Sequence, residues 1–343
     1  QQFITVAHPP QARMAQAVAA AAAPNSSVYV VLSATFGEQY AFYLPLTVLL
    51  WKHIGIGSIV FLVGGRWQTA AGEFIQATLR DLGALMAFLP VPGHIPLTII
   101  AQHTRFYAPW VPGVAPDSVL ITSDADIWPI SAPMYAFNAT DYDVKVLDAY
   151  AFSFFRVLPK FEGGLGRAFK TVHSKDNLTG LIIYPQFPIT NIIMRAHTWK
   201  QVLNVTFPDD TVTATGIWDV VTDFLGFKPS VAQASRKGPL WFSDQFYISQ
   251  KIMDLAYGHV LRAHLVPRKN KLDRLHPKGI WCPSDAKALC PLVRRMLDSH
   301  NPRDPRPRPQ QRCLLGILRC ILSPADMARA DRIAQQYLAL KRG

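Results

Sequence analysis

The sequence predicts an α/β fold in which a mostly parallel, twisted sheet is flanked by helices. Between residues 28 and 127, short apolar runs alternate with longer stretches whose apolar residues recur at helical spacing. The short runs are apolar throughout, which is expected of strands that helices cover on both faces. Strands and helices in close alternation form right-handed βαβ units, so consecutive strands are expected to run parallel.

Four strands and three helices are expected in the first part of the chain. The first apolar run, VYVVLS, is rich in β-branched residues, and the second ends at the pair Gly64-Gly65. The expected strands are 28–33, 58–64, 84–90 and 118–127, and the expected helices are 37–54, 69–83 and 96–108.

Beyond residue 130 the pattern is less regular. Strands are expected at 144–149 and 181–184, and helices at 197–203, 217–227 and 241–257. The glycine-rich stretch 163–166 indicates a loop, which is either a lid over a ligand or an ordinary connection. From residue 262 onward Pro, Arg and Lys dominate, so we expect an exposed linker at 301–309 and a surface helix at 325–341.

Composition limits the class of protein. The chain has 343 residues, of which half are hydrophobic and 17% are charged, so it can build a large globular core. The net charge of +12 suits a polyanionic ligand, an anionic membrane surface or acidic glycans. We expect no nucleic-acid partner, because the positive charge is spread thinly before residue 262 and no nucleic-acid-binding module accompanies it.

Sequons and cysteines favour the secretory pathway. Four N-x-S/T sequons are present, more than chance supplies in this length, at Asn25, Asn138, Asn177 and Asn204. All cysteines lie in the C-terminal quarter, at Cys282, Cys290, Cys313 and Cys320. Their spacing matches no zinc-site pattern, so we expect two disulfides that staple the tail, with all three pairings open. The alanine-rich stretch 15–23 is too short for a transmembrane helix.

The segment 118–129, SVLITSDADIWP, is the most informative in the chain. A short apolar strand leads directly into two aspartates, Asp124 and Asp126, which Ala125 separates. Carboxylates at the mouth of a buried strand are costly unless a positive group meets them. Because oxygen ligands suit Mg²⁺ or Mn²⁺, the pair indicates a divalent cation that carries a diphosphate. The alternative is an Asx-type turn with two solvated aspartates.

Two further loops are expected beside this pair. In parallel α/β sheets, ligands bind beyond the carboxyl ends of the strands. The loop 34–37 follows the first strand, and the loop 64–66 follows the second. We therefore expect both loops to face the same crevice as Asp124 and Asp126.

The order of elements and the string TSDADIWP resemble the GT-A-type, DxD-containing, metal-dependent glycosyltransferases over roughly residues 28–257. Some eukaryotic members of that class share the form T-S-D-x-D-h-W-P. The resemblance implies a GT-A-like, Rossmann-like fold. It also implies a Mn²⁺ or Mg²⁺ ion between Asp126 and the two phosphates of a nucleotide-sugar donor, with Asp124 on the ribose or on a metal-bound water.

The same resemblance implies a division of the chain. Residues 1–26 are a leader or stem remnant, 27–260 a catalytic domain and 261–343 a basic, disulfide-stapled extension. The catalytic domain has a nucleotide-sugar half, 27–130, and an irregular acceptor half, 131–260. Donor contacts are expected from Ser33, Ala34, Thr35, Gly64, Arg66, Arg105, Asp124 and Ala125. An ordinary surface position is the alternative for both arginines.

A second signal is the string WFSDQFYISQKI at 241–252. In glycosyltransferases of this kind an aspartate from this region often meets the acceptor hydroxyl, so Asp244 is the candidate catalytic residue and Gln245 a candidate acceptor contact. An inverting enzyme would use Asp244 as general base, and a retaining enzyme would use it to position the acceptor or stabilise charge. The structural alternative is a helix start, with Ser243 as cap and the aspartate in the first turn.

The resemblance also implies a histidine near the end of the catalytic domain as a third metal ligand. Three are available, His259, His264 and His276, and we take His276, in DRLHPKGIW, as the candidate. A surface or packing role is the alternative for each of them.

Aromatic side chains and prolines mark the expected acceptor side. Pyranose faces stack on aromatic rings, so we expect acceptor contacts from Trp128, Trp218 and Trp241, with core packing as the alternative for each. Residues 184–188 contain two prolines and are expected to form a rigid acceptor-side loop.

These features predict a glycosyltransferase that moves a sugar from a nucleotide-sugar donor, a UDP-sugar, to a hydroxyl of a glycan or glycoprotein acceptor, with Mn²⁺ or Mg²⁺ as cofactor. One alternative is a nucleotidyltransferase of similar fold, although the SATFGEQ loop contains no Lys or Arg. The other is a non-catalytic carbohydrate-binding protein. The expected location is the Golgi lumen, with membrane attachment only through an anchor upstream of this chain.

Overall fold

The computed structural model describes residues 28–37, 40–149, 154–158, 168–172, 182–231, 233–234, 240–266, 271–273, 286–302 and 308–340. The predicted leader 1–26, the glycine-rich loop 163–166 and His276 lie outside the described residues. Contacts divide the chain into two compact units, each built from several segments. The first unit holds residues 89–122 and 137–268, and the second holds 18–88, 123–136 and 269–343.

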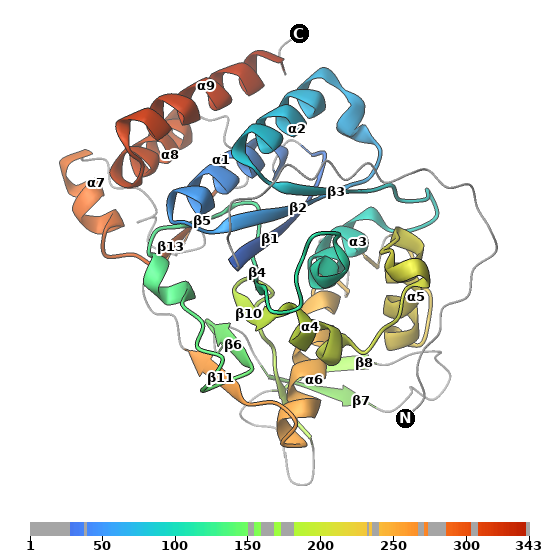
Figure 1. The fold of residues 1–343 in the computed structure, drawn as a ribbon. Coiled ribbons are helices and arrows are strands. Elements are labelled where there is room, and N and C mark those ends of the chain that lie inside the picture. The colour runs from blue at the N-terminus through green and yellow to red at the C-terminus, as the bar shows by residue number, and fades with distance from the viewer. Residues whose placement is uncertain are drawn as a thin grey trace. The chain divides into compact units, whose positions relative to one another are not determined.

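The second unit contains the first three predicted strands and two predicted helices. The strands are β1 (Val28–Thr35), β2 (Gly57–Val63) and β3 (Leu85–Leu89), and the helices are α1 (Tyr40–His53) and α2 (Ala70–Leu82). Strands β1 and β2 are parallel and in register from Tyr29 opposite Gly57 to Thr35 opposite Val63. Helix α1 is buried from Ala41 to Trp51 and contacts β1, β2 and α2 (Figure 1). Its nearly all-round burial explains why it is apolar on every face.

Local sequence signals set the ends of α2. The Thr69 side chain accepts a hydrogen bond from the Gly72 backbone N–H, and Gly83 ends the helix in the left-handed conformation. A threonine cap at the start and a glycine at the end are both helix signals that can be recognised in the sequence. The short 3-10 helix η1 (Arg66–Gln68) precedes α2.

The C-terminal residues belong to the second unit. They form α7 (Ala286–Val293), α8 (Arg308–Ile321) and α9 (Pro324–Leu340), and β12 (Lys271–Asp273) and β13 (Asp298–His300) join β5 (Ile127–Pro129) in a three-stranded sheet. The expectation that residues 325–341 form a surface helix is only half right. One face of α9, which includes Met327, Ile333 and Tyr337, is buried, and α9 contacts α1 and α2.

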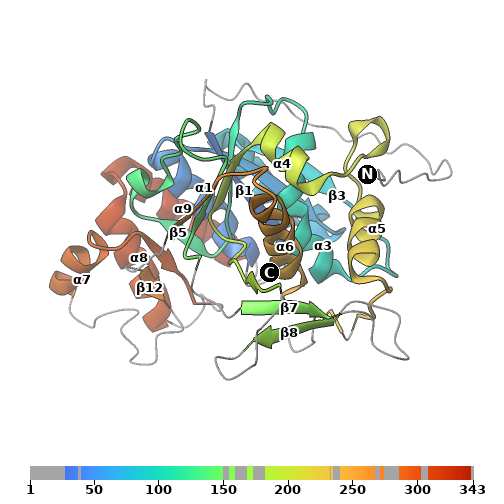
Figure 2. The ribbon, with the colours of Figure 1, turned by 90° about the horizontal axis from the view of Figure 1, so that it is seen from below.

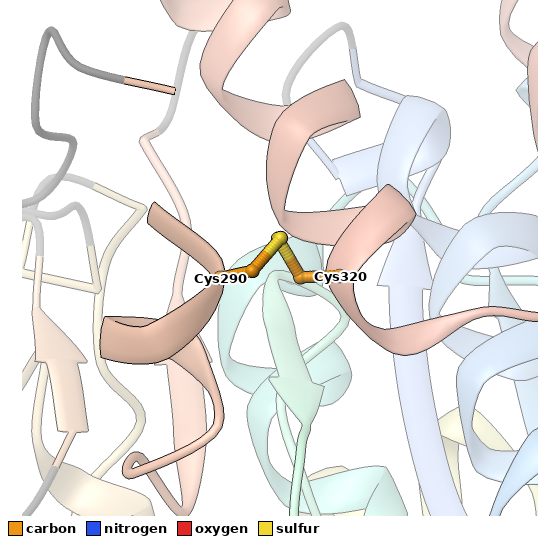
Figure 3. Close-up of a disulfide and its surroundings, with 2 residues drawn as sticks. All are labelled: Cys290 and Cys320. Atoms are coloured by element: carbon orange, nitrogen blue, oxygen red, sulfur yellow. A yellow bond between two sulfur atoms is a disulfide. The ribbon is translucent and has the colours of Figure 1, made fainter. Parts of the chain in front are cut away.

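A disulfide staples this region, as the sequence predicts. Cys290 of α7 is bonded to Cys320 of α8, with the two Cα atoms 5.1 Å apart (Figure 3). This selects one of the three pairings that the sequence leaves open. Cys313, in α8, is also disulfide-bonded, and no described cysteine is a free thiol.

The first unit has a mixed sheet of its own strands in the order β11-β6-β10-β4. Strand β10 (Ile192–Arg195) is antiparallel to β4 (Val119–Thr122) and to β6 (Val144–Leu147), and β6 is parallel to β11 (Ala263–Val266). A second, small sheet holds β7 (Phe154–Leu158), β8 (Ala168–Val172) and β9 (Tyr184–Pro185), and lies beside α6 (Ser243–Tyr257) (Figure 2).

Four more helical segments complete the first unit. They are α3 (Leu97–Thr104), the 3-10 helix η2 (Arg105–Trp110), α4 (Ala196–Leu203) and α5 (Ala214–Leu225). The predicted fold class, a mixed α/β fold with a mostly parallel sheet flanked by helices, is confirmed. Among the described residues, no helix combines the length and apolar character needed to cross a membrane.

Two predicted boundaries are wrong for physical reasons. The fourth strand ends at Thr122 and not at 127, because the chain turns at residues 123–126 and the next three residues pair with β13 instead. The strand predicted at 144–149 stops at Leu147, because Asp148 adopts a left-handed backbone with φ of 61°. Both breaks occur at aspartates, whose side chains favour turns over buried ladders.

Candidate active site

The DxD loop joins the end of β4 to β5. The Ser123 backbone N–H donates to the Val31 carbonyl at 3.1 Å, and the Ile127 N–H closes the turn on the Asp124 carbonyl at 3.1 Å. Asp124 is half-buried, whereas Asp126 is only 2% exposed. A buried carboxylate is costly unless it meets a positive or hydrogen-bonding group, so a turn with two solvated aspartates does not describe Asp126.

His300 is a side chain from a distant part of the sequence that the structure brings close to Asp126. Strand β13 is antiparallel to β5, with His300 opposite Ile127, and the Asn301 N–H donates to the Asp126 carbonyl at 2.9 Å. These contacts place His300 Nε2 4.0 Å from Asp126 Oδ2. Pairing of β13 with β5 therefore brings His300 to Asp126. No sequence motif indicates this contact.

The Asp126–His300 pair fits a divalent metal ion. The carboxylate oxygen of Asp126 and the imidazole nitrogen of His300 lie 4.0 Å apart, close enough for one divalent ion to bind both. A carboxylate with an imidazole suits Mn²⁺ better than Mg²⁺, because imidazole favours transition metals. The described residues contain no cluster of three or more His, Cys, Asp or Glu side chains, so the rest of the shell would come from water and ligand oxygens.

His300 is a further candidate beside the three histidines that the sequence analysis names, and His276 remains untested. His276 lies outside the described residues, and the ring of His264 stacks on Tyr142 at 4.9 Å in the first unit. His300 was missed because it sits in a Pro- and Arg-rich stretch that reads as linker. The one available signal was its place in the C-terminal quarter.

Trp128 is buried in the core of the second unit. Its ring is fully buried, and its Nε1–H donates to Thr47 Oγ1 at 3.1 Å. Thr47 in turn donates to the Ala125 carbonyl at 2.5 Å. Core packing, the alternative given for Trp128, therefore describes its environment. Through Thr47, Trp128 is linked by hydrogen bonds to the backbone of Ala125, between the two aspartates.

The predicted donor loops lie at the carboxyl ends of the parallel strands β1 and β2. Ser33 and Ala34 are buried in β1, so only Thr35 has an exposed part of its side chain there. Gly64 follows β2 with φ of 90°, a left-handed backbone that favours glycine, and Arg66 beyond it is exposed. The edge of the sheet thus offers backbone groups, one hydroxyl and one cation.

The second polar cluster, in the first unit, surrounds the start of α6. Asp244 is 1% exposed, and its Oδ1 accepts from the Gln245 N–H at 2.8 Å. Gln186 Nε2 donates to Gln245 Oε1 at 2.7 Å. Ser243 does not cap the helix, because Phe242 occupies that position, and its hydroxyl lies 3.2 Å from His103 Nε2.

Arg105 and the remaining tryptophans have distinct environments in the first unit. Arg105 is 5% exposed and its Nε–H donates to the Gln102 carbonyl at 3.2 Å, so the surface alternative is wrong for this arginine. Trp218 is 5% exposed within α5, which agrees with core packing, the alternative given for it. Trp241 remains half-buried beside α6, where its carbonyl accepts from Gln102 Nε2 at 2.9 Å.

Asn191 is a candidate that sequence reasoning missed. It precedes β10 with φ of 68°, its N–H donates to the Thr122 carbonyl, and its carbonyl accepts from the Leu147 N–H at 3.1 Å. Its side chain is fully buried, and the amide has no hydrogen-bond partner among the described residues. A buried amide without a partner is rare in folded proteins, so Asn191 is a candidate ligand contact.

No protein-family model and no curated protein matches the sequence. Among solved structures, the galactosyltransferase LgtC, in complex with donor and acceptor sugar analogues, is similar over 88% of this chain and 99% of its own, with 12% identity and a TM-score of 0.44. TarS of S. aureus, in complex with UDP, is similar over 91% of this chain and 70% of its own, with 12% identity and a TM-score of 0.35. A nucleoside-diphosphate-sugar pyrophosphorylase from Vibrio cholerae is similar over 70% of this chain and 91% of its own, with 10% identity and a TM-score of 0.34. These likenesses concern the fold alone.

Proposed function

We propose that this chain is a metal-dependent glycosyltransferase that moves a sugar from a UDP-sugar to a hydroxyl of a glycan or glycoprotein acceptor. The observation that carries the proposal is the approach of His300 Nε2 to 4.0 Å from the buried carboxylate of Asp126, inside the string TSDADIWP. A diphosphate leaving group needs a cation of this kind, because negative charge accumulates on it as the sugar departs.

The proposal gives each predicted donor-side residue a role. Asp126 and His300 hold Mn²⁺ or Mg²⁺, and Asp124 contacts the ribose or a metal-bound water. The metal, when bound, neutralises the charge on the departing UDP without a proton transfer. Arg66 and Arg105 are the cations proposed to assist with the diphosphate. Thr35, Gly64 and Ala125 contribute hydroxyl and backbone groups to the nucleotide.

The acceptor and the transferred sugar are assigned to residues of the first unit. Asp244 acts as general base in an inverting reaction, or positions the acceptor in a retaining one. Gln245 and Trp241 contribute acceptor contacts. The amide of Asn191 offers two N–H donors and one acceptor oxygen, which match sugar hydroxyl groups.

We also propose a location in the lumen of the secretory pathway, in the Golgi. The disulfide between Cys290 and Cys320 supports an oxidising compartment, as do the exposed sequon asparagines Asn138 and Asn204. Immunofluorescence of the full-length protein against a Golgi marker tests this point.

The function is tested by incubating the chain with single nucleotide sugars and Mn²⁺ and measuring nucleotide diphosphate release with and without glycan acceptors. One UDP-sugar is expected to support EDTA-sensitive UDP release. Asp126→Asn and His300→Ala should each lower the rate by at least about 100-fold, since a catalytic metal supplies several kcal/mol of charge stabilisation. Asp81→Asn, an exposed change in the same unit, is the matched control.

The two alternatives give different products. A nucleotidyltransferase would form UTP from UDP-sugar and pyrophosphate, without an acceptor glycan. A non-catalytic binder would retain immobilised glycans and release no UDP. Unchanged UDP release by both Asp126→Asn and His300→Ala would overturn the metal assignment.

A further inference from the structure

One face of helix α1 holds both loops that carry the candidate metal ligands. Tyr43 and Thr47 are four residues apart, so their side chains lie on the same side of the helix. Thr47 Oγ1 donates to the Ala125 carbonyl at 2.5 Å, and Tyr43 Oη donates to the Pro302 carbonyl at 2.5 Å. Ala125 immediately precedes Asp126, and Pro302 follows His300 by two residues.

The hydrogen-bonding roles of Thr47 are fixed by its neighbours. Trp128 Nε1–H can only donate, so Thr47 Oγ1 accepts from it at 3.1 Å and directs its own hydrogen to Ala125. The rings of Tyr43 and Trp128 pack edge to face, with their centroids 5.9 Å apart. The side chains of Tyr43, Thr47 and Trp128 are all fully buried.

Because they are buried, the hydroxyls of Tyr43 and Thr47 hold the two backbone carbonyls firmly. Hydrogen bonds away from water are stronger, and a carbonyl left without its donor in such a place is costly. The two loops are also tied to each other, because the Asn301 N–H donates to the Asp126 carbonyl at 2.9 Å. Each loop is therefore hydrogen-bonded both to α1 and to the other loop.

We infer that Tyr43 and Thr47 are positioning residues that set the spacing of Asp126 and His300 for a divalent metal ion. The inference rests on the proposed function, since it concerns the same metal. Both hydroxyls act through the backbone carbonyls that they hold. Metal sites depend on such indirect partners, whose loss typically lowers metal affinity by about 10- to 100-fold.

The test is a titration of free Mn²⁺, followed by its electron paramagnetic resonance signal, with the full chain. Thr47→Val and Tyr43→Phe remove one hydroxyl each and preserve the shape of the side chain. Each is expected to raise the Mn²⁺ dissociation constant by about tenfold or more. Thr47→Ser keeps the hydroxyl and should restore affinity to within about twofold of the wild type.

Two matched variants separate positioning from general destabilisation. Thr78→Val removes a buried hydroxyl of α2 that donates to the Phe74 carbonyl at 2.8 Å, and Tyr337→Phe removes a buried hydroxyl of α9. Both belong to the same unit and should leave Mn²⁺ affinity unchanged. Thr78→Val should also lower Tm, because it removes a hydrogen bond.

The outcomes distinguish the inference from the proposed function. A wild-type chain that binds no Mn²⁺ overturns the metal assignment, and the inference falls with it. A wild-type chain that binds Mn²⁺, with Thr47→Val and Tyr43→Phe binding equally well, overturns the inference alone. Equal losses of affinity in Thr47→Val and Thr78→Val would also overturn it, because the effect would then follow stability and not position.

Discussion

The Nε2 atom of His103 lies 3.2 Å from the hydroxyl of Ser243, one residue before Asp244. Both side chains are fully buried, and burial lowers the pKa of His103 to about 3, with a smaller contribution from the nearby charge of Arg105. The imidazole is therefore neutral at ordinary pH. The neutral, buried ring contacts the start of α6 through the Ser243 hydroxyl.

We predict that His103 makes the folded protein less stable as the pH falls below about 6.5. Its folded pKa is about 3, whereas a histidine in an unfolded chain has a pKa of about 6.5. Between these values the unfolded state binds the additional proton, so the free energy of unfolding falls by up to about 1.4 kcal/mol per pH unit. Above about pH 6.5 this contribution is constant.

Denaturant unfolding at pH 7.5 and pH 5 measures the effect. His103→Gln removes the titrating group, so its free energy of unfolding should fall less than that of the wild type between the two pH values. His264→Gln changes an exposed histidine of the same unit and should keep the wild-type slope. Parallel profiles for His103→Gln and the wild type would contradict the prediction.

Asp244 is predicted to act in transfer and not in donor binding. Asp244→Asn keeps the size of the side chain and removes its charge, so the acceptor-dependent rate should fall by about 100-fold or more. The dissociation constant for UDP, measured by calorimetry in Mn²⁺, should change less than about threefold. Asp223→Asn, an exposed change in α5, is the control. A matching loss of UDP affinity would instead assign Asp244 to the donor.

The parts of the fold that sequence reasoning found are those with local signals. Helix α2 lies where Thr69 and Gly83 indicate, because a cap and a left-handed glycine act on their immediate neighbours. Strands β1 and β2 were found because continuous apolar runs need no distant partner to be recognised. These signals fix where elements begin and end.

The parts that were missed depend on pairing between distant segments. β13 has only three residues and is a strand because it pairs with β5, which itself follows the DxD turn. That pairing delivers His300 to Asp126, and nothing near His300 in sequence marks it as a ligand. Asn191 escaped notice for a similar reason, since its burial and backbone strain exist only in the folded chain.

The disulfide between Cys290 and Cys320 is predicted to stabilise the second unit by about 3 to 4 kcal/mol, because it closes a loop of 30 residues in the unfolded chain. Cys290→Ser with Cys320→Ser should lower the midpoint of denaturant unfolding accordingly. The double change avoids a free thiol that could exchange with other cysteines. An unchanged midpoint would show that the bond contributes no net stability.

A substitution at Asn191 is predicted to affect activity without affecting stability. Its backbone is left-handed, with φ of 68°, and its fully buried amide has no hydrogen-bond partner among the described residues. Glycine adopts this backbone without strain, and its introduction removes the unsatisfied amide. Asn191→Gly should therefore leave the free energy of unfolding within about 1 kcal/mol of the wild type, or raise it. The rate of sugar transfer should nevertheless fall by at least about tenfold, since the variant lacks the amide proposed to meet the sugar hydroxyls.

Asn204 provides the matched control for this change. It is also left-handed, with φ of 48°, but it is exposed at the end of α4 and is assigned no contact with donor or acceptor. Asn204→Gly should preserve both stability and transfer. If Asn191→Gly transferred sugar at the wild-type rate, the strain at Asn191 would serve the fold alone. If it lost stability by several kcal/mol, the amide would be part of the core, because a side chain held for a ligand contributes little to folding before that ligand binds.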